Sequence, residues 1–356
     1  MTETMRDINS DNIRQLEDMI EGAKSICIAT HMKPDGDAMG SSIAMYHFAK
    51  KNGKSARIVL NDPYPSYLSF LVSKEVLEDI AIYSENPEKT AAAINASDLI
   101  ICLDFNAFHR TEHLESHLAE SAAKKVLIDH HLNPARELFD LSFSETEISS
   151  ASELLYHILV NTSCIGNNAS ALGKECAEAL MTGMTTDTNN FANSVFPSTL
   201  HMASDLLAAG TDRNFILNRI YNQYGENRLR LMGHMMKDLL KITPDGVSYI
   251  VLDKQTQEAY NTSDGDTEGF VNMPLSIADV RMSILAKEDK GRIRISIRSK
   301  RGTSANMCAR RFFNGGGHEN AAGGRLLVPE DVMDINEVGN YIEKYIHIFL
   351  NDEDYK

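Results

Sequence analysis

The sequence predicts an α/β protein of two domains, with a parallel sheet in the N-terminal domain, a helical connector and a smaller C-terminal α+β domain. Three observations predict this arrangement. The chain has 356 residues, which exceeds the size at which one hydrophobic core usually stops growing. In its first half, continuous apolar runs alternate with helical patterns, as in parallel sheets covered on both faces. In its last third, apolar and polar residues alternate within each run, which is typical of a sheet with one buried face.

The predicted elements of the first half alternate between helix and strand. Ile13, Leu16 and Ile20 share one face of a first predicted helix. Residues 37–53 predict an amphipathic helix that ends at Gly53. Apolar runs predict four strands, which are SICIAT (25–30), RIVLN (57–61), DLIICLD (98–104) and KKVLID (124–129). We expect these four strands to lie in one parallel sheet.

The middle of the chain has a helical pattern over residues 197–243. Ser198 is a candidate N-cap and Gly210 a candidate stop for the first helix of this segment. Leu206 and Leu207 are expected on its apolar face. The segment therefore predicts a helical connector between the two domains.

Beyond the connector, alternating runs predict the strands of the second domain. They are VSYIVLD (247–253), VRMSILAK (280–287) and RIRISIRSK (292–300). Asp289-Lys290-Gly291, between the last two runs, predicts a tight hairpin turn. The expected domain boundaries are thus 1–196 for the first domain, 197–243 for the connector and 244–356 for the second domain.

Composition and charge narrow the class of function. The formal net charge of −15 opposes binding to long nucleic acid, which depends on neutralising many phosphates. No basic N-terminal region precedes an apolar stretch, and no run approaches about 18 apolar residues, so neither a secretory signal nor a membrane span is expected. The five cysteines are scattered and form no C-x-x-C pair, which favours a reducing cytoplasm over a disulfide framework or a zinc ribbon.

Basic residues are concentrated near the predicted C-terminal strands. Nine Lys and Arg residues lie between positions 287 and 311, against only Glu288 and Asp289. By itself, this pattern is more typical of a solvated strand face than of a binding surface.

Four segments rich in acidic residues and histidine carry the predicted chemistry. Three of them begin where an apolar strand pattern stops, and the fourth follows the helical run KECAEALMTGM. The segments are HMKPDGDAMGS (31–41), Asp104, Asp129-His130-His131 and TTDTNNF (185–191). Because ligands bind beyond the carboxyl ends of parallel strands, we expect the segments to meet in one crevice.

The residue types in these segments suit a hard divalent metal. Carboxylates with a minority of imidazoles favour manganese or magnesium, and none of the segments contains cysteine. Asp35 and Asp37 flank Gly36, so that their carboxylates can point toward different ions, and Asp104 is a natural bridging carboxylate. Each segment alone could be an ordinary turn or helix cap. Together they predict a two-metal phosphoryl-transfer site.

The four segments, in this order and approximate spacing, resemble the motifs of the DHH phosphoesterase superfamily. In the second half, GFVNMPLSI (269–277), RSK (298–300) and GGGHENAAGG (315–324) resemble its DHHA1 substrate domain. The resemblance spans about residues 20–345. Size and layout are most similar to the NrnA-like group of nanoRNases and 3′-phosphoadenosine-5′-phosphate phosphatases.

The resemblance implies a role for each residue of the predicted centre. His31 and Asp35 would bind one Mn²⁺ ion, Asp37, His130 and Asp187 would bind a second, and Asp104 would bridge both, with Mg²⁺ as an alternative. Asp129 would orient an imidazole. His131 would contact phosphate or protonate the leaving group, which leaves the identity of the general acid open.

The resemblance also implies where substrate phosphates bind. Arg110 matches the family pattern, although an ordinary surface arginine would look the same. Arg298 can contact phosphate through two nitrogens. A glycine-rich loop is expected to offer backbone N–H groups to an anion, with a plain turn as the alternative. The loop residues are Gly315, Gly316, Gly317 and His318.

The expected function is manganese-dependent hydrolysis of short oligoribonucleotides, of 3′-phosphoadenosine-5′-phosphate, or of both, in a cleft between the two domains. One alternative is a phosphodiesterase for cyclic di-AMP or pApA. Another is a nucleotide sensor that keeps the fold without catalysis. Expected partners are short RNA oligonucleotides or small nucleotides, without long nucleic acid or a membrane, and a homodimer is left open.

Overall fold

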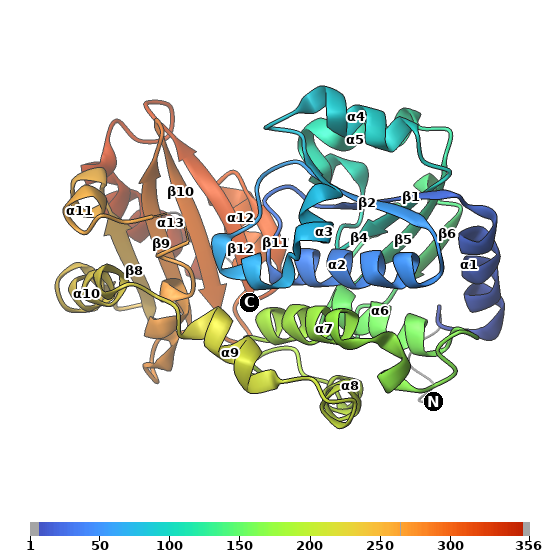
Figure 1. Ribbon diagram of the computed structural model, residues 1–356. Helices are drawn as coiled ribbons and strands as arrows, with labels where there is room; N and C mark the ends of the chain where they lie inside the picture. The colour runs from blue at the N-terminus through green and yellow to red at the C-terminus, as the bar shows by residue number, and fades with distance from the viewer. Residues whose placement is uncertain (1–6, 264, 352–356) are drawn as a thin grey trace. The chain divides into compact units, whose positions relative to one another are not determined.

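A computed structural model describes residues 7–263 and 265–351, which form two compact units that divide between Gln223 and Tyr224 (Figure 1). Each unit contains one six-stranded sheet. The α/β class and the two-part organisation predicted from the sequence are confirmed. The predicted boundaries at 1–196, 197–243 and 244–356 stay a prediction.

The sheet of the N-terminal unit is parallel throughout. Its strands are β1 (Ser25–Thr30), β2 (Ser55–Leu60), β3 (Ile80–Ile82), β4 (Leu99–Leu103), β5 (Lys124–Asp129) and β6 (Leu141–Ser144). Their order is β3-β2-β1-β4-β5-β6. β2 and β3 therefore extend the sheet on one side of β1, and β4, β5 and β6 extend it on the other side. Ligands bind at such a reversal point in open parallel sheets.

Helices cover both faces of this sheet. The helices of this unit are α1 (Ser10–Gly22), α2 (Gly36–Lys51), α3 (Lys74–Glu78), α4 (Pro87–Asn95), α5 (Glu115–Glu120), α6 (Ala151–Val160), α7 (Lys174–Asp187), α8 (Pro197–Ala208) and α9 (Arg213–Tyr221). Of these, α8 packs against α6 and α7, and α9 packs against α7. Alternate residues of β1 enter separate cores: Ile26 and Ile28 pack in the core that contains α1, α2, α6 and α7. Cys27 and Ala29 pack on the opposite face. The continuous apolar runs of the sequence thus reflect strands that are buried on both faces.

Helix α2 differs from the amphipathic helix that the sequence predicts. It is buried continuously from Gly36 to Tyr46, because it lies against the sheet on one side and α7 on another. A Cβ atom on Gly40 would lie 2.6 Å from the carbonyl oxygen of Ala179. The backbones of α2 and α7 therefore touch at this point, where only glycine fits.

The first helix of the predicted connector has a different N-cap from the one expected. Helix α8 starts at Pro197 with Phe196 as its N-cap, so Ser198 lies inside the helix and is not the cap. Proline suits the first helical position because that position lacks an intrahelical N–H bond. Leu206 is buried in the N-terminal core, whereas Leu207 is 47% exposed.

The sheet of the C-terminal unit has the order β11-β12-β10-β9-β8-β7. Its strands are β7 (Lys241–Ile242), β8 (Val247–Leu252), β9 (Met282–Asp289), β10 (Arg292–Ser299), β11 (Gly316–His318) and β12 (Ala321–Leu327). Its helices are α10 (Glu226–His234), α11 (Lys254–Ala259), α12 (Ala305–Phe312) and α13 (Val338–Asn351), with a 3₁₀ element, η6, at Phe270–Ser276. β8 and β9 pair in parallel and the other neighbours are antiparallel.

The two faces of this second sheet are covered to different extents. One face packs on α12 and α13. On the other face, Ile250 of β8 and Leu285 of β9 pack under residues of α10 and η6. β8 and β9 are thus buried on both sides, unlike the half-buried strands that the sequence predicts, whereas β10 alternates as expected. Within the described ranges, none of the helices has the length and apolarity needed to cross a bilayer.

Candidate metal centre

The predicted metal ligands come together at the carboxyl edge of the N-terminal sheet. His31 follows β1, Asp104 follows β4, His130 follows β5, Asp35 and Asp37 lie at the start of α2, and Asp187 ends α7. The side chains form overlapping groups whose ligand atoms lie within 4.8 Å of one another. β1 and β4 are the strands between which the order reverses, so the fold itself brings their following residues together.

The first group consists of His31, Asp35 and Asp104. Nε2 of His31 lies 3.4 Å from Oδ2 of Asp104 and 3.8 Å from Oδ1 of Asp35. The other ring nitrogen of His31, Nδ1, lies 2.8 Å from the carbonyl oxygen of Met32. A backbone partner of this kind fixes the orientation of a metal-binding imidazole. The histidine is therefore held with Nε2 toward the two carboxylates.

The second group consists of Asp37, His130 and Asp187. Nε2 of His130 lies 3.6 Å from Oδ2 of Asp187 and 3.5 Å from Oδ1 of Asp104. Asp104 thus presents Oδ1 to His130 and Oδ2 to His31. One carboxylate between two ligand groups is the arrangement expected of a bridging ligand.

The backbone of Asp104 has a left-handed conformation, with φ of 63°. Aspartate tolerates this region better than most residues other than glycine. The conformation ends β4 sharply, while the Asp104 N–H still donates to the carbonyl of Ile128 on β5. The side chain is only 4% exposed, so its two oxygens are held between the histidines.

Asp129 and His131 form a hydrogen-bonded pair beside these groups. Nδ1 of His131 lies 2.7 Å from Oδ1 of Asp129, which is fully buried. The backbone N–H of His131 also donates to Asp129, at 3.2 Å. Because a carboxylate oxygen accepts, Nδ1 of His131 is the donor in this contact, which orients the imidazole ring. His131 also belongs to a third group with Asp104 and His130.

The aspartates at the start of α2 are held by backbone N–H groups. Asp35 is the N-cap of α2, and its Oδ1 accepts hydrogen bonds from the N–H groups of Asp37 and Ala38. The carboxylate of Asp37 lies at the start of another helix, α6. It accepts from the N–H of Ala151 at 2.6 Å and of Ser152 at 2.8 Å. The N-terminal end of a helix stabilises a negative charge at this position.

Glu153 supports this arrangement and was not predicted from the sequence. It is fully buried, and its Oε2 accepts from the N–H and hydroxyl of Ser149 and from the hydroxyl of Thr199 at 2.6 Å. These bonds fix the turn that presents the α6 N–H groups to Asp37. The S-x-x-E pattern from Ser150 to Glu153 is a signal for the helix start. The contact with Asp37 has no signal in the sequence, because it joins backbone groups to a side chain 114 residues away.

The electrostatics of the site in the absence of metal favour cation binding. Burial raises the pKa of Asp37 well above its usual value, and the negative charges of Asp104 and Asp187 raise it further. Burial also raises the pKa of Asp187 to about 7. Although burial acts against the charged form of His130, its contact with Asp104 brings the pKa of that histidine to about 10. Protons and a divalent ion therefore compete for these ligand atoms.

We expect the affinity of the metal-free protein for Mn²⁺ to rise between pH 6 and pH 8. Asp187 loses its proton as the pH passes about 7, so above that pH the ion no longer competes with this proton. His130 remains protonated at both pH values and must release its proton on binding. Each displaced proton contributes about tenfold in affinity per pH unit below its pKa. Titration calorimetry in buffers of different ionisation enthalpy measures both quantities.

The matched variant for this measurement is Asp187→Asn. It should bind Mn²⁺ more weakly and show a shallower pH dependence across pH 7, because the titrating carboxylate is absent. An affinity of the unmodified protein that stays constant from pH 6 to pH 8 would contradict the expectation.

The predicted substrate residues lie in both units. Arg110 is half-buried in the 3₁₀ element η2 (Phe108–Leu114), and its carbonyl accepts from the N–H of Met32, next to His31. Arg298 lies on β10, and the loop residues from Gly315 to His318 precede and form β11. A Cβ atom on Gly315 would lie 1.9 Å from the carbonyl oxygen of Gly323 on β12, so this loop requires glycine. The binding roles of all these residues stay predictions.

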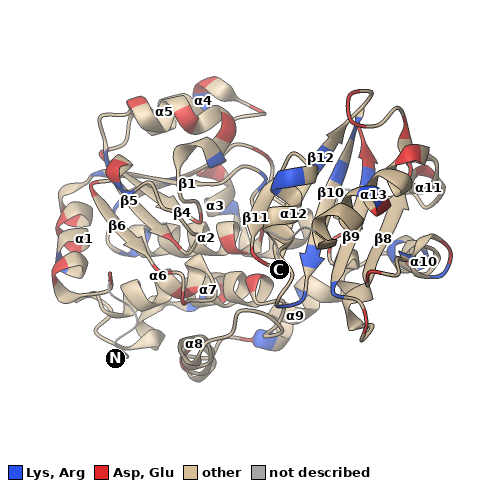
Figure 2. Cartoon of the chain, turned by 180° about the vertical axis from the view of Figure 1, so that it is seen from behind, with Lys and Arg blue, Asp and Glu red and all other residues tan. Residues whose placement is uncertain are grey.

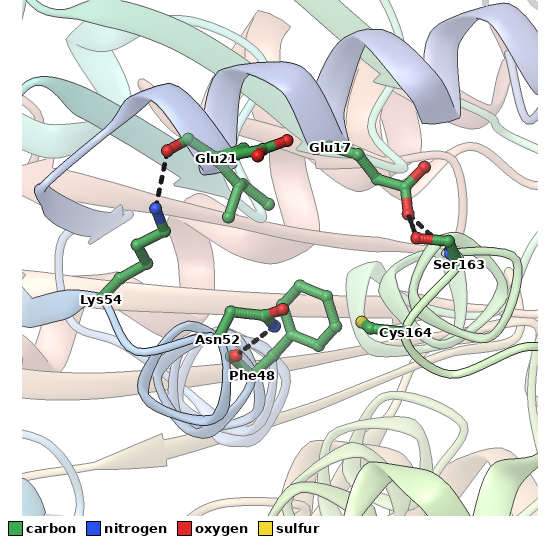
Figure 3. A pocket seen from close by; sticks show the side chains of 8 residues that line it. Glu17, Glu21, Phe48, Asn52, Lys54, Ser163 and Cys164 are labelled. Carbon is green, nitrogen blue, oxygen red and sulfur yellow. Dashed lines mark hydrogen bonds between the residues drawn. The ribbon is translucent and has the colours of Figure 1, made fainter.

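A cavity of about 210 Å³ is lined by residues that include Glu17, Phe48, Asn52 and Ser163 (Figure 3). Phe48 and Asn52 line it at the C-terminal end of α2, whereas Asp35 and Asp37 lie at the N-terminal end. Glu17 in its wall accepts hydrogen bonds from the N–H and hydroxyl of Ser163, both at 2.6 Å. The cavity is therefore distinct from the candidate metal centre.

The chain is similar to known families and to proteins of solved structure. The model of the DHH family, N-terminal domain, matches residues 25–184, and that of the DHHA1 domain matches residues 233–344. The bifunctional oligoribonuclease and PAP phosphatase NrnA of Bacillus subtilis is 26% identical, over 85% of this chain and 89% of that protein. The crystal structure of an exopolyphosphatase-related protein from Bacteroides fragilis has 35% identity and a TM-score of 0.89, covering 98% of both chains. The cyclic-di-AMP phosphodiesterase GdpP of Geobacillus thermodenitrificans is 25% identical, over 94% of this chain but 49% of that protein.

Proposed function

The chain belongs to the DHH family of phosphoesterases and carries a DHHA1 domain, and we propose that it hydrolyses short oligoribonucleotides and 3′-phosphoadenosine-5′-phosphate with two divalent ions. The observation that carries the proposal is the position of Asp104, whose two oxygens face two separate ligand groups. The similarity to NrnA over most of both chains supports the substrates. The cyclic-di-AMP alternative has weaker support, since the chain spans about half of GdpP.

The donor set fits a pair of hard divalent cations. Six side chains supply carboxylate oxygens and imidazole nitrogens without a thiolate, which suits Mn²⁺, with Mg²⁺ as the alternative. In this proposal His31 and Asp35 hold one ion, Asp37, His130 and Asp187 hold the other, and Asp104 contacts both. Such a pair supplies an activated water and neutralises charge that develops on the phosphoryl oxygens. The intact donor set is also the argument against a sensor without catalysis.

The remaining residues of the proposal bind the substrate and move a proton. In the proposal, Asp129 orients the imidazole of His131, and His131 contacts a phosphate oxygen or protonates the leaving group. Arg110, Arg298 and the loop from Gly315 to His318 are assigned to the substrate phosphates. The proposal also includes a cytoplasmic location, which agrees with five cysteines that all lack disulfide bonds. A homodimer stays a prediction.

We expect turnover on 3′-phosphoadenosine-5′-phosphate and on oligomers of about two to five nucleotides to exceed turnover on a strand of about 50 nucleotides by tenfold or more. With a net charge of −15, the chain offers no broad positive track for a long polyanion. The measurement is the initial rate on a labelled length series at fixed salt, with Mn²⁺ and with a chelator. Equal rates on the short and long strands, or full activity in chelator, would refute the proposal, and exclusive cleavage of cyclic di-AMP would favour the alternative.

A further inference from the structure

A row of three basic residues crosses the sheet of the C-terminal unit. Arg294 on β10 lies opposite Lys287 on β9 and opposite Arg325 on β12 in the strand register. Arg294 and Arg325 are exposed, and Lys287 is half-buried. Lys and Arg positions, drawn blue, recur along β10 and β12 of the ribbon (Figure 2). The register therefore brings together residues from a basic stretch and from a strand about thirty positions further along the chain.

The row lies on the face of β10 that is not covered by α12 and α13. Ile293, Ile295 and Ile297 are buried in the core below those helices. Residues of β10 that alternate with them, including Arg294 and Arg298, project from the opposite face. α10 and η6 cover that face over β8 and part of β9, and Lys287 borders this covered area because its register partner on β8, Leu252, is buried there. Arg294 and Arg325 lie on the far side of Lys287 from β8 and are exposed.

In the absence of a bound anion, the row lowers the stability of the folded protein. Like charges directly opposite each other on neighbouring strands destabilise a sheet, because their Cβ atoms are only about 4.5–5.5 Å apart. Arg292 nearby has a carboxylate partner, Asp289, at 4.0 Å. Among residues 7–263 and 265–351, none of the three residues of the row has an ion pair with a carboxylate. A bound polyanion would relieve this repulsion.

The spacing along β10 indicates which anion the row suits. Arg294 and Arg298 lie on the same face four residues apart, which corresponds to about 13 Å along a strand. A stacked single strand of nucleic acid advances about 3.4 Å per nucleotide, so about four nucleotides cover this distance, and fewer if the strand is extended. A single nucleotide advances one such step and covers only part of this distance.

We propose that Lys287, Arg294 and Arg325 form a subsite for the internal phosphates of an oligonucleotide whose end is bound at Arg298. The proposal rests on the proposed function, in which Arg298 contacts a substrate phosphate. The guanidinium groups bind phosphate oxygens and do not read bases, so the subsite is independent of sequence. It adds affinity for substrates of about four or five nucleotides and none for 3′-phosphoadenosine-5′-phosphate.

The test compares the double variant Arg294→Gln/Arg325→Gln with the unmodified protein on three substrates. For a 5-mer, we expect KM to rise about tenfold with kcat unchanged. For a 2-mer and for 3′-phosphoadenosine-5′-phosphate, kcat/KM should stay within twofold. The salt dependence of 5-mer binding is the slope of log Kd against log salt concentration. Loss of two phosphate contacts should lower this slope by about 1.4. The matched control is Lys254→Gln/Lys344→Gln, which removes two exposed charges from α11 and α13 of the same unit.

The outcomes separate this inference from the proposed function. Equal losses on all three substrates, or no change for the 5-mer, would overturn the subsite. The melting temperature without substrate checks the fold, and it should not fall, because the variant removes like-charge repulsion. If the unmodified protein hydrolysed none of the substrates, the proposed function would fail. Binding of the 5-mer, measured by fluorescence anisotropy with its salt dependence, would then still decide whether the row binds oligonucleotides.

Discussion

Replacing Asp104 by asparagine should abolish the binding of two divalent ions and lower kcat by at least about 10²–10³-fold, the loss typical of removing one preorganised electrostatic group. The change preserves the shape of the side chain and removes the charge that both ligand groups share. It also removes the contact that keeps the pKa of His130 high and the repulsion that raises the pKa of Asp37. Metal content by mass spectrometry and the rate on a 2-mer are the two measurements.

Asp98→Asn is the matched control for this variant. Asp98 immediately precedes β4, at the opposite end of that strand from Asp104, and accepts hydrogen bonds from the N–H groups of Lys24 and Ser25. Its replacement should leave metal content and kcat unchanged. An Asp104→Asn protein that keeps two ions and normal turnover would show that Asp104 does not bridge the metals.

Replacing Gly183 by alanine should lower metal occupancy and activity by about tenfold or more, with a loss of about 1–3 kcal/mol in the free energy of unfolding, as for other overpacked interiors. A Cβ atom at this position of α7 would lie 2.0 Å from the hydroxyl oxygen of Ser152 and 2.9 Å from Oδ1 of Asp37. The added methyl group therefore pushes apart Asp37 and the helix start that holds it. Metal titration, turnover and chemical denaturation measure the three effects.

Two further variants make this prediction specific to the site. Gly22→Ala lies in α1, where an added Cβ atom would have no neighbour within 4 Å, and should leave activity unchanged. Ser152→Gly in the Gly183→Ala protein removes the nearest clashing atoms and should restore part of the metal binding. A Gly183→Ala protein with normal metal affinity would mean that α6 and α7 adjust without moving Asp37.

The sequence predicts the strands of the first sheet to the extent that they form continuous apolar runs. β1, β2, β4 and β5 have such runs because both of their faces are buried. β3 and β6 were not predicted, since they are edge strands of only three and four residues. The predicted cap at Ser198 was wrong because Pro197, with its fixed φ, already begins the helix. The preference of serine for the N-cap position is weaker than the fixed φ of proline at the first helical position.

Much of the candidate site is predictable because parallel strands end at one edge of a sheet. His31, Asp104 and His130 each follow such a strand, so sequence order and strand pattern place them together without knowledge of contacts. The support of Asp37 by Ala151 and Ser152 could not be predicted in this way. It depends on backbone N–H groups at the start of a helix. Every residue type except proline has such a group, so the identities of those two residues do not indicate the contact.

All six predicted metal ligands lie between residues 31 and 187, within the unit that ends at Gln223. The second unit has its own sheet and its own cores. Mutations in β9, β10 and β12 can therefore accumulate without disturbing the residues proposed to carry out hydrolysis. The residues proposed to hold the ions and the row proposed to bind the oligonucleotide thus belong to separate units, so substrate length preference can be changed by substitutions in the second unit without altering any of the six ligands.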